Sequence, residues 1–389
     1  MSQILDNIVI VGGGPVGATL ALLLVRQGMS VTVLEVRKQG AAYNESRALA
    51  LSYGSRRILE KLGVWNRLAK SATAINTIHV SQKGSLGRSK LQAHDYKQEA
   101  LGYVLSYGAL SEALDESLAT ESNVNFVFEA LAERIEHTST LASVTYNYHG
   151  VSKVLNSKLV VLADGGRSLD EVAGLVKVIK EYGHDALISK VSAELPHNNV
   201  AYERFTANGP MALLPNGERD FSLVWTGKKE YVNSLLLLDD TDFLVKFHEQ
   251  FGDRVGKFFS VEKRMTFPLK LSQLKTLDVE HLVVIGNAAQ TMHPVAGQGF
   301  NVGLRDAESL AHSITSATIE TLGSAQMLAT YQTNRKSDTK GGLLFTDFLV
   351  NIFSNDIIGL SSLRSVGLSL FDVIKPAKKH LVRKMSFGK

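Results

Sequence analysis

The sequence predicts an α/β protein in which a Rossmann-like nucleotide-binding domain carries an inserted, mainly antiparallel β-sheet domain. Three observations support this fold class. Near the amino terminus, an apolar strand leads through a glycine-rich turn into an apolar helix. Two further apolar strands, at 160–163 and 282–285, each end in a turn that contains glycine, and short strands lie between them at 186–226. The chain has 389 residues, 44% of them hydrophobic, and should form roughly two domains.

The composition excludes several classes of protein. Basic and acidic residues nearly balance, at 42 against 38, so nucleic-acid binding is not expected. There is no cysteine, which rules out disulfides and thiolate metal sites and fits a reducing compartment. Met1–Asp6 lacks the pattern of a signal peptide, and the apolar stretches are too short or too interrupted by polar residues to span a bilayer. We expect a cytoplasmic protein that is soluble or peripheral to the inner face of the cytoplasmic membrane.

The first element is a strand over Ile8–Val11, and the helix after it spans Ala18–Gln27. The turn between them has the G-x-G-x-x-G spacing. Such a turn lets the backbone approach a pyrophosphate, which then meets the free N–H groups at the start of the helix. The residues of this predicted phosphate cradle are Gly12, Gly14, Pro15, Val16 and Gly17.

A second strand, Val31–Leu34, ends at Glu35. This carboxylate is placed to accept hydrogen bonds from a ribose diol, and it disfavours a 2′-phosphate. NADP is therefore the least favoured nucleotide here, but the turn does not decide between NAD and FAD.

Two later strands end in turns that are unremarkable when each is taken alone. The strand at 160–163 ends in Asp164-Gly165-Gly166, and the strand at 282–285 ends in Gly286-Asn287. After the second of these, a glycine-rich loop at 293–301 opens a long helix. Backbone N–H groups of Gly299 and Phe300, beside Asn301, could point at the pyrimidine end of a flavin, where negative charge builds on reduction. A loop kept only for packing is the alternative.

No second G-x-G-x-x-G follows a strand, so a nicotinamide donor would have no Rossmann domain of its own. Together with the absence of cysteine, this argues against the disulfide-reductase type of flavoprotein.

The three motifs, in this order, resemble the single-component FAD-dependent aromatic hydroxylases related to p-hydroxybenzoate hydroxylase. The resemblance covers almost the whole chain and implies a glutathione-reductase-2-like FAD-binding domain. Gly-Asn-Ala-Ala-Gln-Thr-Met-His-Pro-Val-Ala-Gly-Gln-Gly-Phe-Asn, at 286–301, departs from the usual Gly-Asp-Ala-Ala-His of that family. It is similar to the ubiquinone-biosynthesis hydroxylases, and nearest to the 2-octaprenyl-6-methoxyphenol hydroxylase type.

The resemblance also implies roles for individual residues. Asp164 and Gly165 would touch both FAD and the incoming NAD(P)H, while Gly286 and Asn287 would hold the ribityl chain, since an amide oxygen can still accept its hydroxyl groups. Arg47 would lie near the FAD pyrophosphate, although an ordinary surface arginine is the alternative. Ala132, after the strand Val124–Phe128, corresponds to the position whose backbone faces adenine.

The chemistry implied by the resemblance is carried by the flavin. NAD(P)H reduces FAD, O₂ reacts with the reduced flavin to give a C4a-hydroperoxide, and a hydroxyl group passes to a polyprenylated phenol, para to its hydroxyl. His293 would position the ring or relay a proton, unless its role is structural. The alternatives are a prenyl reductase or a halogenase on the same scaffold, or a non-catalytic flavoprotein scaffold for other ubiquinone-biosynthesis proteins. We find no pattern for a metal site or for hydrolytic chemistry.

By this resemblance the FAD-binding domain comprises 1–72, 102–177 and 272–320, and the substrate domain comprises 73–101 and 178–271. Strands are expected at 77–81, 186–193, 211–214 and 221–226, with Asn216-Gly217 as a hairpin turn. Met211, Leu213 and Trp225 are candidates to line the substrate pocket, and a plain sheet core is the alternative for each.

The region 321–389 is expected to be helical. Its last fifteen residues carry six basic side chains and no acid, with apolar residues interleaved. Such a tail suits anionic lipid. A solvated tail or a partner-docking helix remains open.

Overall fold

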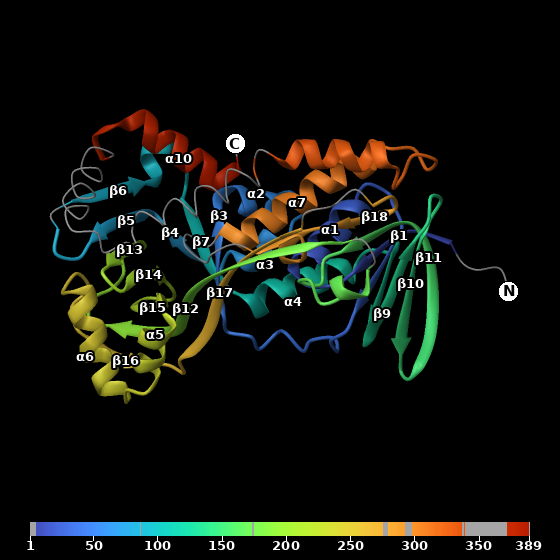
Figure 1. Cartoon of the computed structure of the whole chain (residues 1–389). Coiled ribbons are helices and arrows are strands. Elements are labelled where there is room, and N and C mark those ends of the chain that lie inside the picture. The colour runs from blue at the N-terminus through green and yellow to red at the C-terminus, as the bar shows by residue number, and fades with distance from the viewer. Residues whose placement is uncertain are drawn as a thin grey trace.

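The computed structural model describes residues 5–85, 87–172, 175–274, 279–291, 298–336, 338 and 372–388. Within these ranges the strands form three sheets (Figure 1). The α/β fold class expected from the sequence is confirmed, with a Rossmann-like sheet and a mainly antiparallel sheet in one chain.

The first sheet is the Rossmann-like one. Its order among the described strands is β8-β2-β1-β11-β10-β9, and β18 also pairs with β11. Strands β8, β2, β1, β11 and β18 run parallel, whereas β9 and β10 form an antiparallel extension. The bounds are β1 Leu5–Val11, β2 Val31–Glu35, β8 Val124–Phe128, β9 Ala130–His137, β10 Ala142–Tyr148, β11 Val151–Leu162 and β18 Leu282–Val284. Because parallel strands end at the same sheet edge, the three predicted motifs meet there.

Helices pack on this sheet through a large apolar core. The apolar helix α1 lies against both α4 and α7, and a serine side chain caps the amino end of α2 and of α4 by accepting a backbone N–H bond. The bounds are α1 Pro15–Val25, α2 Tyr53–Lys61, α3 Trp65–Leu68, α4 Tyr107–Leu118 and α7 Gln298–Thr315, with short 3₁₀ turns η1 Ala93–Tyr96, η2 Leu169–Glu171 and η3 Gly286–Ala288.

The second sheet lies mostly in the region expected to form the substrate domain, and its order is β19-β17-β12-β15-β14-β13-β5-β6, with β16 on β12. Its pairings are antiparallel except for that of β13 with β5. The bounds are β5 Thr77–Gln82, β6 Arg88–Gln92, β12 Lys177–Ala193, β13 Val200–Thr206, β14 Gly209–Pro215, β15 Asp220–Lys228, β16 Phe258–Val261, β17 Met265–Leu274 and β19 Gln290–Thr291. Figure 1 shows β12 and β17 extending from this domain toward the Rossmann-like sheet.

Two helices, α5 (Lys229–Leu236) and α6 (Asp240–Phe251), cover one face of the substrate sheet. Met211, Leu213 and Trp225 are fully buried on this face, among the phenylalanines of α6. Of the two readings open for these residues, pocket lining and plain sheet core, this burial favours the sheet core. The alternation of side chains along a strand places these residues on one face of the sheet. It does not tell from the sequence which layer of the protein covers that face.

A small third sheet, β3-β7-β4, connects the two larger parts. Its strands are β3 Ala48–Ser52, β7 Gly102–Ser106 and β4 Thr73–Ile75. Although β4 lies in a segment assigned to the substrate domain from the sequence, it pairs with β7. The small sheet also packs against the substrate sheet through Ile75, Val104 and Ala201.

The carboxyl-terminal region is helical over 325–336 and in α10, Lys375–Phe387. Helix α10 is docked on its own chain. The Ser52 hydroxyl donates to the Ser386 carbonyl, and Val382 packs beside Leu91. Just before the helix, the Asp372 carboxylate accepts from the Lys90 N–H. Its apolar residues are therefore largely used inside the molecule.

Candidate functional site

The first and second motifs are in direct contact at the sheet edge. Gly12 has φ +104°, and a Cβ atom there would lie 2.6 Å from the Cα and backbone N atoms of Asp164. A Cβ atom at Gly17 would lie 1.9 Å from the Gly12 carbonyl oxygen, so α1 packs directly on the turn. Both positions therefore require glycine.

The third motif closes the same site from the side of α7. A Cβ atom at Gly303 would lie 2.8 Å from Val16 Cγ2 and 3.2 Å from the Gly286 Cα atom. At Gly299 it would lie 3.8 Å from Asn287 Oδ1. Gly299 and Phe300 fall in the first turn of α7, whose N–H groups have no acceptor within the helix. The structure thus brings the described residues of all three motifs together.

The amino end of α1 is arranged to receive an anion. Gly14 precedes the helix, and no side chain caps it, so the first N–H groups are left to a ligand. A Cβ atom at Gly14 would come no closer than 3.5 Å, to Tyr107 Oη, and 3.9 Å, to Arg37 Nη2. The guanidinium of Arg47 lies 4.8 Å from the Tyr107 ring centroid and pairs with Glu45 at 2.9 Å. Two arginines therefore lie around the predicted phosphate cradle.

Glu35 lies at the end of β2, buried beneath this cradle. Its Oε2 atom accepts the Gly13 N–H at 2.8 Å, and its Oε1 atom accepts the backbone N–H and the Nε–H of Arg37, both at 2.9 Å. Burial by itself raises the pKa of Glu35, but the hydrogen bonds from Arg37 and Gly13 outweigh it and lower the pKa. The carboxylate is thus held ionised and oriented, and Arg37 Nη2 donates a further hydrogen bond to its Oε2 atom at 3.2 Å.

Arg37 was not found by the sequence reasoning. The signal that could have identified it is a basic residue two positions after the acidic end of a Rossmann strand. Its side chain reaches Glu35, the Tyr107 hydroxyl at 3.3 Å and the surroundings of Gly14 at once.

Asp164 shapes the turn of the second motif. Its carboxylate accepts the N–H of Gly166 at 2.9 Å and the N–H and hydroxyl of Ser168 at 2.7 and 2.6 Å. Gly165 has φ +77° with open space where a Cβ atom would be, so a ligand can approach its backbone closely.

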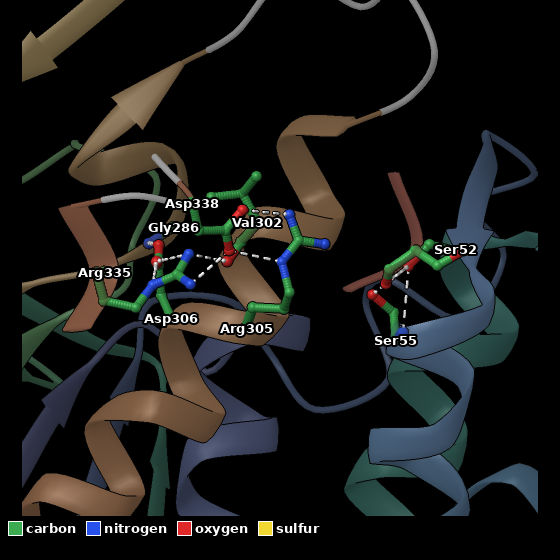
Figure 2. Close-up of polar contacts among 9 residues, drawn as sticks. Ser52, Ser55, Gly286, Val302, Arg305, Asp306, Arg335 and Asp338 are labelled. Atoms are coloured by element: carbon green, nitrogen blue, oxygen red, sulfur yellow. Dashed lines mark hydrogen bonds and ion pairs between the residues drawn. The ribbon is translucent and has the colours of Figure 1, made fainter. Parts of the chain in front are cut away.

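A buried ionic network anchors the third motif (Figure 2). The Asp306 carboxylate accepts the Gly286 N–H at 3.1 Å and pairs with Arg335 at 2.7 Å. Asp338 in turn accepts bonds from Arg335 and, in bidentate fashion, from Arg305 at 2.7 and 3.1 Å. The network fixes α7 relative to the turn that begins at Gly286. Asp306 lies within α7, while its partner Arg335 comes from a later segment of the chain.

The remaining predicted residues are placed as follows. The Asn301 side chain is buried, with Oδ1 accepting the Ser52 N–H at 2.7 Å and Nδ2 donating to the Ala50 carbonyl at 2.8 Å, so it ties α7 to β3. Ala132 lies in β9, opposite Tyr146 at a register shift. His293 lies outside the described residues. In the part of the chain that the structure describes, no cluster of potential metal ligands is present.

The site fits an elongated dinucleotide that is held at both of its ends. One end offers an uncapped helix start, two arginines and the carboxylate of Glu35, and the other offers the first turn of α7 and the amide of Asn287. Gly12, Gly14 and Gly165 leave room where a Cβ atom would obstruct the approach of a ligand or of the neighbouring motif.

Known proteins are similar to this chain in sequence and in architecture. A family model described as FAD binding domain matches residues 6–341. Ubiquinone hydroxylase UbiL of Rhodospirillum rubrum is 33% identical over 97% of this chain and 88% of its own length. The 3-demethoxyubiquinol 3-hydroxylase of Escherichia coli is 27% identical over 93% of both chains. The crystal structure of p-nitrophenol 4-monooxygenase PnpA from Pseudomonas putida has a TM-score of 0.79 at 16% identity, covering 99% of this chain and 98% of that one.

Proposed function

The chain belongs to the FAD binding domain family, and from this premise we propose that it is an FAD-dependent monooxygenase that hydroxylates a polyprenylated phenol in ubiquinone biosynthesis. The convergence of Gly12, Asp164 and Gly286 at one sheet edge is the observation that carries the flavin site. The substrate class rests on the relatives, which are named as ubiquinone hydroxylases over nearly the whole chain.

The residues of the chain bind and orient the cofactor. The uncapped start of α1 receives the pyrophosphate, with Arg37 and Arg47 nearby, and Glu35 accepts from the adenosine ribose. Asn287 accepts from the ribityl chain, and the first turn of α7 stabilises negative charge at the pyrimidine end of the ring. When bound, FAD supplies the redox chemistry, which no side chain provides.

We further propose NAD(P)H as the electron donor and O₂ as the second substrate. The chain carries one G-x-G-x-x-G turn, and Glu35 is engaged at it. A nicotinamide donor would therefore bind transiently against the flavin site and have no domain of its own. Asp164 and Gly165 suit this contact. They follow β11, which borders β1 on the side away from β2 and Glu35.

A steady-state assay tests the function. Purified protein loaded with FAD should oxidise NAD(P)H faster when 2-prenylphenol is added, and a hydroxylated product should accumulate in proportion to the NAD(P)H consumed. If the phenol stimulates no oxidation and yields no hydroxylated product, the hydroxylase assignment is wrong. A protein that holds FAD without turnover would instead be the non-catalytic scaffold.

We also propose that α10 makes a peripheral contact with anionic membrane. Other ubiquinone-biosynthesis proteins would bind the protein at that membrane surface. Lys375, Lys379 and Arg383 are exposed on this helix, and Val373 and Ile374 just before it are 76% and 42% exposed. Among the described residues, no helix is both long and apolar enough to cross a membrane.

A further inference from the structure

The two faces of the substrate sheet have different surroundings. The face with Met211 and Trp225 is covered by α5 and α6. On the other face, Ile78, Ala201 and Leu214 pack against Ala48, Ile75 and Val104 of the small sheet. Ala48 directly follows Arg47, and its strand β3 bonds to Asn301 of α7. This second face is therefore turned toward the FAD-binding domain.

Glu203 lies on the face that is turned toward the FAD-binding domain. It follows Ala201 by two residues in β13, and this strand pairs with both neighbours without a register shift. The two side chains therefore point to the same face of the sheet, roughly 7 Å apart along the strand. Its partners across the neighbouring strands are Val80 and Ala212. Arg204, the next residue, points to the other face and donates to the Gln250 carbonyl of α6 at 2.9 Å.

The carboxyl group of Glu203 has no partner among the described residues. It makes no hydrogen bond and no ion pair, and no described titratable group contributes to its pKa. Burial alone raises that pKa to about 8, although the side chain is only half-buried. The group is thus partly buried and still borders accessible space.

An unpartnered acid in such surroundings is unfavourable for folding, because burial without compensating hydrogen bonds costs free energy. Val80, Ala201 and Ala212 around it show that apolar residues suit the position. Acidic groups with strongly shifted pKa values in such places are typical of binding and catalytic sites.

We propose that Glu203 is the polar anchor of the aromatic substrate, with its carboxyl group accepting a hydrogen bond from the ring hydroxyl of a phenol. The proposal rests on the hydroxylase function above and adds a residue to the substrate side of the site. A phenol that binds there presents its ring between the substrate sheet and the FAD-binding domain. Its hydrogen bond to Glu203 would increase the electron density of the ring, which favours hydroxylation.

Binding of a matched pair of probes to the FAD-loaded protein tests the role. The probes are 2-prenylphenol and its O-methyl ether, which keeps the shape and loses the O–H donor, and binding is followed by the change in flavin absorption. At pH 8.5, where the carboxyl group is mostly ionised, we expect Glu203→Leu to raise the Kd of the phenol about 10-fold or more, the loss typical of a hydrogen bond to a charged group, and to leave the Kd of the ether unchanged. Glu203→Gln should raise the phenol Kd less, because its amide oxygen still accepts.

Glu230→Gln is the control, since it makes the same chemical change at an exposed position of α5 and should leave both Kd values unchanged. Equal Kd values for the phenol in wild type and Glu203→Leu would overturn the inference, as would equal losses for phenol and ether, which indicate packing alone. Should Glu203→Leu fail to fold, a phenol Kd in Glu203→Gln that equals the wild-type value at pH 8.5 would also overturn it.

The proposed function can fail separately. If wild-type protein neither binds nor hydroxylates the phenol, both the function and the role of Glu203 fall. If wild type hydroxylates the phenol and the variants bind it as tightly, only the role of Glu203 falls.

Discussion

At the scale of single residues, Gly12 determines whether the first two motifs can touch. A methyl group there meets the backbone of Asp164 at 2.6 Å, and the φ of +104° is unfavourable for any other residue. We expect Gly12→Ala to lower the free energy of unfolding by about 2–4 kcal/mol through clash and backbone strain, and to lose FAD during purification. Urea unfolding and the flavin-to-protein absorbance ratio measure the two effects.

Gly28→Ala is the matched control for Gly12. Its φ of +82° imposes a similar backbone penalty, but nothing lies within 4 Å of the added methyl group. This variant should lose only about 1 kcal/mol and retain FAD. If both variants lost equal stability and both kept FAD, the contact between Gly12 and Asp164 would not matter for the site.

Glu203 should also leave a signature in the pH dependence of stability. Its pKa is raised from the ordinary 4.5 to about 8 in the folded protein, because burial disfavours the charged form. The contribution of the protonated Glu203 to the free energy of unfolding is therefore fully present below pH 4.5. It is lost as the pH rises toward 8, because the folded protein then gives up the proton that it holds in excess of the unfolded chain. Glu203→Gln should remove that loss, so its Tm should exceed the wild-type Tm by a margin that grows from pH 6 to pH 9. A constant difference in Tm across this range would contradict the shifted pKa.

At the scale of elements, α7 depends on an ionic network that is closed by a distant segment. Asp306→Ala removes the acceptor of the Gly286 N–H and leaves the guanidinium of Arg335 buried with one carboxylate fewer. We expect a loss of about 3–5 kcal/mol in the free energy of unfolding and weaker FAD retention. Glu308→Ala, on the same helix, breaks only an exposed pair with Lys61 and should cost less than about 1 kcal/mol. Denaturant unfolding of the two variants would contradict this account if their losses were equal.

Helix α10 combines a docked apolar side with an exposed basic side. If it contacts lipid, the wild-type protein should sediment with vesicles that contain anionic phospholipid and should be released by high salt, because the attraction is screened. Replacing Lys375, Lys379 and Arg383 by Gln should abolish this binding and leave FAD content unchanged. Binding that persists in the triple variant, or that is equal on zwitterionic vesicles, would refute the membrane contact.

At the scale of the whole molecule, several segments join the two domains. β17 pairs with β19 of the third motif, the small sheet packs on the substrate sheet, and α10 contacts β6 as well as α2. The domains should therefore unfold together. In Trp65→Phe the only tryptophan is Trp225, in the core of the substrate domain, so its fluorescence reports that domain and flavin release reports the other. We expect both signals to change at the same urea concentration.

Excess FAD should shift both midpoints to higher urea by the same amount, with about 2.7 kcal/mol of added stability at a hundred times the Kd. A Trp225 transition that stays in place while flavin release moves would show that the domains are energetically independent. Wild-type protein, in which the flavin-release midpoint should equal that of the variant, is the control.

The sequence by itself determined the local parts of the flavin site. The strand, turn and helix around Gly12, the acid at Glu35 and the turns at Asp164 and Gly286 lie where their spacing predicts them, because neighbouring residues set backbone geometry and free N–H groups. The alternating strands of the substrate domain were predictable for the same reason, and the expected strand at 124–128 has the bounds of β8.

Only the tertiary structure decided which layer covers each face and which distant charges meet. Met211, Leu213 and Trp225 proved to be core, and Glu203 proved to face the FAD-binding domain, because a two-residue period separates the faces of a strand without naming their neighbours. The pairing of Arg335 with Asp306, 29 residues apart in the sequence, follows from how packed elements approach one another. Such approaches depend on the whole core and not on any local run of residues.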